Sequence, residues 1–232
     1  MNIRDNFLKI RKEIPDYVQI VLAAKMRTKE EIEEAISAGA EIIGENYVQE
    51  AEKMYQELGE KARKVKWHLI GALQKNKINR ALRIFDCIQT VDSSELAEAI
   101  NKRAHNLNKK ISVFIEINIG SEITKTGVKP EYEVIKELAE HISKLNYLKL
   151  EGLMTMGPRT GNPEDVRVHF RKTKEFFNRL KGANIPNVEL KYLSMGMSNS
   201  YKVAIEEGAN MVRLGTGIFG KRAYDLAGDD RL

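Results

Sequence analysis

Short apolar stretches recur eight times along the chain, and each is followed or preceded by a segment in which apolar residues return every three or four positions. The stretches are rich in valine, isoleucine and leucine and carry few charges. A run of this kind is typical of a strand that is covered on both faces, as in a parallel sheet. The predicted strands are residues 17–24, 40–44, 65–71, 87–91, 111–119, 148–154, 188–193 and 210–214.

The segments between these strands predict helices, and a lead-in helix precedes the first strand. Pro15 ends the lead-in helix, because a proline disfavours helical backbone in the residue before it. Thr28 and Glu31 have the spacing of a capping box, in which each side chain accepts a bond from the backbone N–H of the other residue. The predicted helices are residues 3–14, 28–38, 48–58, 75–84, 92–106, 131–145, 165–180 and 201–207.

Eight strands that alternate with helices predict the α/β fold class and a single (β/α)8 barrel of the TIM type. The length of 232 residues suits one barrel domain, residues 1–232, and leaves little chain for a second domain. An open, doubly wound sheet is the structural alternative, because a strand count taken from pattern alone is fallible.

Charge and cysteine content exclude several classes of protein. The 38 Lys+Arg and 33 Asp+Glu residues give a net charge of +5 and are interleaved along the chain, which indicates a solvated surface rather than nucleic-acid binding. Cys87 is the single cysteine, so an internal disulfide is excluded, and no Cys/His cluster has zinc spacing. No apolar run approaches the ~18–20 residues that span a membrane. We expect a soluble, cytoplasmic protein without a metal site.

Two strand ends late in the chain have the composition of a phosphate site. Residues 192–200 read Tyr-Leu-Ser-Met-Gly-Met-Ser-Asn-Ser, and residues 210–220 read Asn-Met-Val-Arg-Leu-Gly-Thr-Gly-Ile-Phe-Gly. Each is a strand that opens into a turn of glycines and hydroxyl side chains, which offers backbone N–H groups to an anion. If these are the seventh and eighth strands of a barrel, they lie where that fold most often binds phosphate.

Lys25 follows the first predicted strand in an otherwise apolar frame. A desolvated lysine amine can lose its proton and condense with an aldehyde to form a Schiff base, which arginine cannot do. Together with a phosphate site, this lysine favours pyridoxal 5′-phosphate (PLP) as the aldehyde. A surface lysine that merely ends the strand is the alternative from the residues alone.

Motifs spread over nearly the whole chain carry a resemblance to a known family. They lie at residues 24–25 (Ala-Lys), 44–50 (Gly-Glu-Asn-Tyr-Val-Gln-Glu), 67–77, 113–118, 125–127 (Lys-Thr-Gly), 151–154, 193–198 and 212–220. In these motifs the chain resembles the pyridoxal phosphate homeostasis proteins, small cytoplasmic PLP-binding barrels related in fold to the N-terminal domain of alanine racemase. The resemblance implies a PLP fold type III barrel without the C-terminal β-domain of the racemase.

The resemblance also implies roles for single residues. Lys25 matches the lysine that links the cofactor, and Asn46 is similar to a residue near the ring hydroxyl. Arg213 matches the arginine that faces the pyridine nitrogen; because arginine stays protonated and donates, the ring nitrogen carries no proton and the ring is a weaker electron sink. The residues that match the phosphate cradle are Ser198, Gly215 and Thr216.

One departure from the family pattern surrounds the lysine. The family usually has a serine before it and Thr-Lys or a similar pair after it, whereas this chain has Ala24, Met26 and Arg27. A hydroxyl beside the Schiff base is therefore missing, and we do not expect its loss to abolish binding.

The implied function is PLP homeostasis by storage, delivery or buffering, without catalytic residues or substrate turnover. PLP-dependent apo-enzymes are candidate recipients, and a monomer is expected. Amino-acid racemisation through the same Schiff base is one alternative, and a phosphate-binding barrel enzyme in which Lys25 is incidental is another. In alanine racemase, a tyrosine from the additional β-domain completes the site. We expect that domain to be absent here, because the sequence ends at Leu232, and Tyr224 in the tail is a weak substitute.

Two further features have a structural and a functional interpretation. His68 lies inside the third predicted strand, where we expect a buried, hydrogen-bonded histidine rather than a proton carrier. Lys75, Lys77, Arg80 and Arg83 make the most basic stretch, which we expect to be a solvated helix face, with a partner surface as the alternative.

Overall fold

The strands form a closed parallel barrel. The computed structural model of the protein describes residues 2–122, 126–158 and 162–220. In these residues each strand pairs with the next one in sequence, and the eighth pairs back to the first. The strands are β1 (Gln19–Ala23), β2 (Ile42–Glu45), β3 (Lys66–Leu69), β4 (Cys87–Val91), β5 (Ile111–Glu116), β6 (Leu148–Met154), β7 (Val188–Met197) and β8 (Met211–Leu214). The barrel prediction is confirmed, and the open-sheet alternative is excluded.

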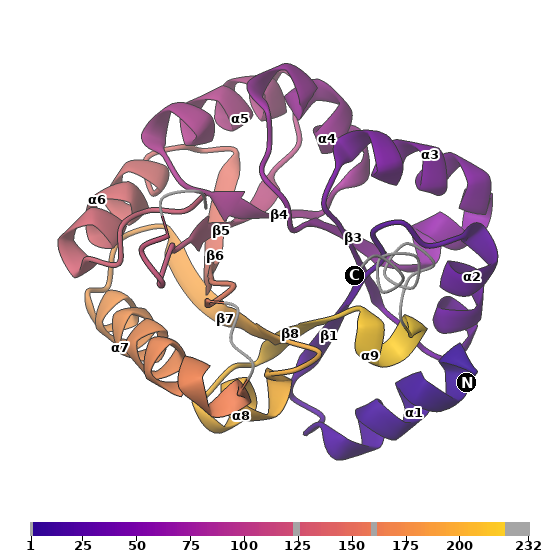
Figure 1. Cartoon of the computed structure of the whole chain (residues 1–232). Coiled ribbons are helices and arrows are strands. Elements are labelled where there is room, and N and C mark those ends of the chain that lie inside the picture. Colours follow the sequence, from indigo (N-terminus) through magenta and orange to yellow (C-terminus); the bar gives the residue numbers. More distant parts are fainter. Residues whose placement is uncertain (1, 123–125, 159–161, 221–232) are drawn as a thin grey trace, which may run out of the picture.

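Helices surround the barrel on its outside (Figure 1). The predicted capping box forms, with the Glu31 N–H donating to the Thr28 hydroxyl at 3.3 Å and the Thr28 N–H donating to the Glu31 carboxylate at 2.7 Å. The α-helices are α1 (Ile3–Glu13), α2 (Lys29–Ser37), α3 (Val48–Leu58), α4 (Ile78–Ile84), α5 (Ser94–Asn106), α6 (Tyr132–Ile142), α7 (Arg167–Gly182), α8 (Tyr201–Glu206) and α9 (Thr216–Phe219). The 3-10 turns are η1 (Gly59–Lys64), η2 (Lys75–Lys77) and η3 (Pro163–Val166).

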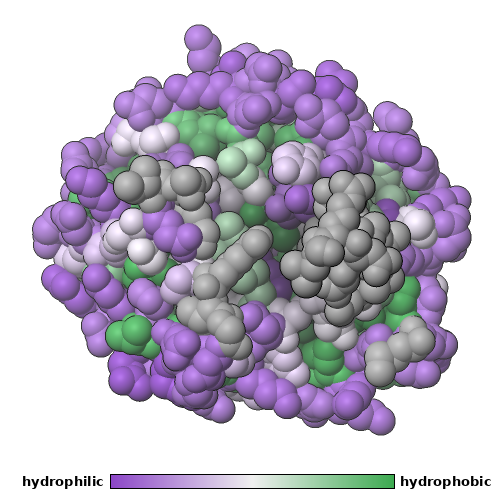
Figure 2. Space-filling model, in the orientation of Figure 1, coloured by the Kyte–Doolittle hydropathy of each residue, from purple (hydrophilic) through white to green (hydrophobic). Residues whose placement is uncertain are grey.

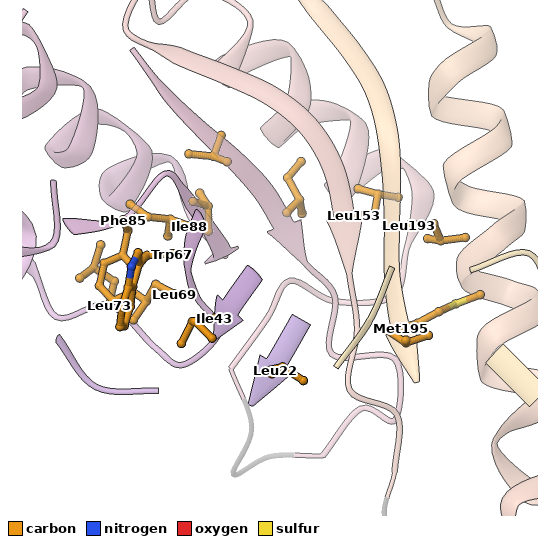
Figure 3. Close-up of a cluster of buried hydrophobic side chains, with 14 of the residues drawn as sticks. Leu22, Ile43, Trp67, Leu69, Leu73, Phe85, Ile88, Leu153, Leu193 and Met195 are labelled. Atoms are coloured by element: carbon orange, nitrogen blue, oxygen red, sulfur yellow. The ribbon is translucent and has the colours of Figure 1, made fainter. Parts of the chain in front are cut away.

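Side chains alternate along each strand, so the barrel separates two apolar layers. The outer layer packs between strands and helices; Leu22, Ile43, Leu153 and Leu193 belong to it, as Figure 3 shows. A fully buried leucine or isoleucine contributes about 1.5–3 kcal/mol relative to an exposed one. The inner layer fills the lumen with Val21, Ile42, Ile70, Cys87, Phe114, Met154 and Met211.

Several predicted boundaries differ from those of the structure. The helix predicted over residues 75–84 begins as a 3-10 turn before α4, β5 ends at Glu116 rather than at residue 119, and β7 continues to Met197 rather than ending at residue 193. The last two differences change which side chains lie at the strand ends.

The lead-in helix α1 packs beside α9, next to the strands that were predicted to carry the phosphate site (Figure 1). The side-chain amide of Asn6 donates to the carbonyl of Ile218 in α9 at 2.9 Å. α1 therefore helps to fix α9 at the mouth of the barrel. Within the described residues, no helix is both long and apolar enough to cross a bilayer.

Candidate functional site

The six residues predicted to bind PLP lie at or just beyond the carboxyl ends of β7, β8, β1 and β2. These strands are consecutive neighbours in the barrel. The register places Val21 of β1 beside Arg213 of β8, and Ala23 beside Gly44 of β2, while Met197 of β7 pairs with Arg213. Residues distant in sequence thus meet on one arc of the barrel mouth. That mouth is the face seen in Figure 2, where a largely hydrophilic rim surrounds it.

Lys25 lies in the turn that follows β1 and is half-buried. Its Nζ atom lies 5.2 Å from the centre of the Tyr47 ring, which comes from the turn after β2 and is half-exposed. A cation over an aromatic face at an exposed site gains about 0.5–1 kcal/mol. Met26, the next residue, has a left-handed backbone with φ of 58°. The amine of Lys25 is thus held at the barrel mouth and remains accessible to solvent.

Ser198 and the start of α9 form a compact group of donors. The Ser198 hydroxyl accepts bonds from the backbone N–H groups of Gly215 at 3.2 Å and Gly217 at 3.1 Å. A Cβ atom on Gly215 would lie 3.3 Å from the Ala23 carbonyl, and one on Gly217 would lie 3.4 Å from the Ser198 hydroxyl. The glycines therefore permit the close approach of the two turns. Converging N–H and O–H groups of this kind suit a phosphate.

Arg27 joins the turn of Lys25 to α9. Its guanidinium donates to the carbonyls of Phe219 at 3.3 Å and Gly220 at 2.5 Å, and it also bonds Glu31 at 3.2 Å. The side chain is 5% exposed. This residue is part of the departure from the family pattern, and the structure gives it a specific role: it fixes the distance between the lysine turn and the donor group.

Arg213 is buried in the lumen and held by two acceptors. One guanidinium nitrogen donates to the Ser194 hydroxyl and the other to the Thr155 carbonyl, each at 2.7 Å. Burial lowers the pKa of Arg213 to about 10, and the buried Glu116 carboxyl opposes that effect. The guanidinium therefore remains charged near neutral pH.

A chain of buried polar groups continues from Arg213 across the lumen. The Ser194 hydroxyl donates to the side-chain carbonyl of Gln89 at 2.7 Å, and the Gln89 amide lies 2.8 Å from Nδ1 of His68. Burial lowers the pKa of His68 to about 3, so the ring is neutral and Nδ1 accepts from the amide. His68 is thus a buried, hydrogen-bonded histidine, as predicted.

Gln89 and Ser194 were not among the six residues predicted to bind PLP. The sequence signal was weak: Gln89 is a polar residue inside an apolar strand, and Ser194 was one of several hydroxyl residues near the end of β7. Glu116, at the end of β5, was also missed. Burial raises the pKa of Glu116 to about 7, while a bond from the Thr126 hydroxyl at 3.0 Å works in the opposite direction.

Asn46 follows β2 and is half-buried at the mouth. Its backbone carbonyl passes so close to Gly71 that a Cβ atom there would lie 2.3 Å from the oxygen. The Gly71 carbonyl in turn accepts from the Thr90 hydroxyl at 2.9 Å. These contacts fix the backbone of Asn46, and its role toward a ring hydroxyl stays a prediction.

Other candidate residues lie away from this arc. In the basic stretch, Arg80 pairs with Glu52 of α3, and Lys75 is exposed. Tyr224 lies outside the described residues. No group of three or more His, Cys, Asp or Glu side chains in the described part of the chain could hold a metal ion.

Comparison with known proteins identifies the family. Residues 1–223 match the family described as alanine racemase, N-terminal domain. The pyridoxal phosphate homeostasis protein of Aquifex aeolicus is 45% identical over 202 residues, which are 87% of this chain and 86% of that protein. The corresponding protein of Haemophilus influenzae is 36% identical and covers 98% of this chain and 99% of its own length. The chain belongs to the pyridoxal phosphate homeostasis protein family.

Solved structures agree with this membership. PipY of Synechococcus elongatus PCC7942 with PLP bound has a TM-score of 0.85 and 31% identity, and the match covers 94% of this chain and all of PipY. Alanine racemase of Clostridium difficile shares the fold, with a TM-score of 0.82 at 20% identity. The match covers 96% of this chain and 57% of the racemase. The resemblance inferred from the sequence motifs is confirmed.

Proposed function

We propose that this protein binds PLP covalently through Lys25 and serves intracellular PLP homeostasis by storing, delivering or buffering the cofactor. One observation carries this proposal: the turn that holds Lys25 and the donor group around Ser198 follow neighbouring strands of the barrel, and Arg27 connects the two. The PLP-bound relative PipY, which matches nearly the whole chain, supports it.

The residues fit the chemical groups of the cofactor. When bound, PLP supplies an aldehyde that condenses reversibly with a primary amine, a phosphate and a pyridine ring. Lys25 offers the amine. Ser198, Gly215 and Thr216 offer hydroxyl and N–H donors for the phosphate, and the glycines leave space that a Cβ atom would fill. Arg213 offers a permanent donor for the ring nitrogen, and Asn46 is assigned to the ring hydroxyl.

The electrostatics of the site favour binding over catalysis. A guanidinium that stays protonated donates to the ring nitrogen and leaves it without a proton, so the ring draws electrons weakly. Hydrogen bonds from both of its terminal nitrogens to the protein hold the Arg213 side chain in place. Together with the membership in a family of homeostasis proteins, this leads us to infer that turnover of amino-acid substrates is negligible. We also infer that residues 1–232 act as one domain, that the protein works as a monomer, and that PLP-dependent apo-enzymes are its recipients.

Titration of the PLP-free protein with PLP, followed by visible absorption, tests this proposal. Wild type should develop the colour of a protein-bound Schiff base, and Lys25→Ala should not. Lys29→Ala is the matched control, since Lys29 is a nearby half-buried lysine that pairs with Glu33 at 3.7 Å. It should bind like wild type. A Lys25→Ala protein that develops the same band as wild type would refute the assignment of Lys25.

Exchange of the α-proton of added amino acids for deuterium tests the absence of turnover. The PLP-loaded protein should exchange no faster than free PLP with the same amino acids. Exchange well above that rate would establish a racemase-type activity and overturn the non-catalytic part of the proposal.

A further inference from the structure

A groove of about 700 Å³ opens between α2 and α3 at the mouth end of the barrel. Figure 1 shows these two helices side by side on the outside of β1 and β2. The buried side chains of Ala24 and Met54 form its apolar floor together with Glu45. Glu45 points outward, because it follows Ile43 of the outer layer at the two-residue repeat of β2. The groove therefore lies on the other side of the barrel wall from the lumen that holds Arg213.

Glu45 is a buried acidic residue with an unsatisfied carboxyl oxygen. It is 2% exposed, and its Oε2 atom has no hydrogen-bond partner among the described residues. Burial and the neighbouring Glu50 raise its pKa to about 8. A buried carboxyl oxygen without a hydrogen-bond partner is costly, so such atoms normally receive a donor or a cation. Neither the lysine turn nor the phosphate donors use this group.

Among the side chains that line the groove, the acidic groups without an ion-pair partner outnumber the basic ones. Each basic side chain in it is already engaged: Arg27 with Glu31 at 3.2 Å, Lys29 with Glu33 at 3.7 Å, and Lys53 with Glu57 at 3.8 Å. Within the described residues, the acidic groups of the groove without an ion-pair partner are Glu30, Glu45 and Glu50.

We propose that this α2–α3 groove is a second binding site, which takes the ammonium group of a small aliphatic amine or polyamine. The ammonium would pair with Glu45 at the floor, with Glu50 adding its charge, and the methylene chain would lie on Ala24 and Met54. An anion is disfavoured by Glu30 and Glu50, which have no ion-pair partner among the described residues. A metal ion is disfavoured too, because the described residues contain no cluster of three or more metal-ligating side chains.

Calorimetric titration of the PLP-free protein with spermidine tests the proposal, and PLP must be absent because its aldehyde reacts with free amines. An ammonium ion paired with Glu45 requires the ionised carboxylate. A carboxyl with a pKa of about 8 is about 90% protonated at pH 7, so binding should release close to one proton there. Repeating the titration in buffers of different ionisation enthalpy measures that release.

Glu45→Gln keeps the shape of the side chain and removes its charge. We expect it to abolish the proton release and to weaken spermidine binding at least tenfold. Glu57→Gln is the matched control: Glu57 lines the same groove but pairs with Lys53, so its loss should leave the proton release intact and change affinity by less than threefold. Binding to wild type without proton release, unchanged binding to Glu45→Gln, or no binding to wild type would each overturn the proposal.

Discussion

Removing the Ser194 hydroxyl should destabilise the protein strongly, because that group links two buried partners. It accepts a bond from the charged guanidinium of Arg213 and donates one to Gln89, both at 2.7 Å. A bond to a charged group contributes about 1.5–3 kcal/mol and a neutral bond about 1 kcal/mol. Ser194→Ala leaves both partners buried without it, so we expect a loss of about 3 kcal/mol, or roughly 6–12 °C in Tm for a chain of this length.

Urea denaturation of the PLP-free protein measures this loss, with Ser200→Ala as the control. Ser200 is also buried, and its hydroxyl accepts one neutral bond, from the Met197 N–H at 3.2 Å. That substitution should cost about 1 kcal/mol. If Ser194→Ala costs no more than Ser200→Ala, the buried chain does not hold Arg213 in the way described.

Three other substitutions test separate parts of the structure. Glu45→Gln should be more stable than wild type, and the difference in unfolding free energy should grow as the pH rises from about 4.5 to about 8 and stay constant above. The reason is that in this window the unfolded chain loses the Glu45 proton while the folded chain keeps it. A pH-independent difference in urea denaturation would contradict this. Arg27→Lys should weaken PLP binding about tenfold in absorption titrations, because lysine cannot reproduce the forked bonds to the carbonyls of Phe219 and Gly220 at the end of α9. Unchanged affinity would show that α9 is held without Arg27. Gly71→Ala should lower the free energy of unfolding by more than about 2 kcal/mol, since the new Cβ atom would lie 2.3 Å from a backbone oxygen. Gly182→Ala is the control, because its Cβ atom would meet nothing within 4 Å and should not destabilise the protein. Equal stability of the two variants would refute the reasoning.

The sequence was sufficient for the fold because both faces of the strands in this barrel are covered. Largely apolar runs such as residues 20–24 therefore mark the strands, and their alternation with amphipathic helices leaves few topologies. The end of β7 was less predictable. Glycine and serine residues indicated a turn after residue 193, but Ser194 still pairs with β6 and β8, so the strand continues.

The helix α9 and the chain of buried polar groups could not be predicted from local patterns. The four residues of α9 include a glycine, and the helix is fixed by Asn6 and Arg27, whose partners lie about 200 residues away in sequence. Gln89 meets Ser194 across the lumen at a separation of 105 residues. Such contacts exist only after the barrel closes, so pattern and spacing carry little information about them.

Covalent trapping of the cofactor tests the central claim most directly. The PLP-loaded protein is reduced with borohydride, which converts a Schiff base into a stable secondary amine, and is then digested and examined by mass spectrometry. The pyridoxyl group is predicted on the peptide that contains Lys25 and absent from the Lys25→Ala protein treated in the same way. A modification on another lysine, or none at all, would contradict the account.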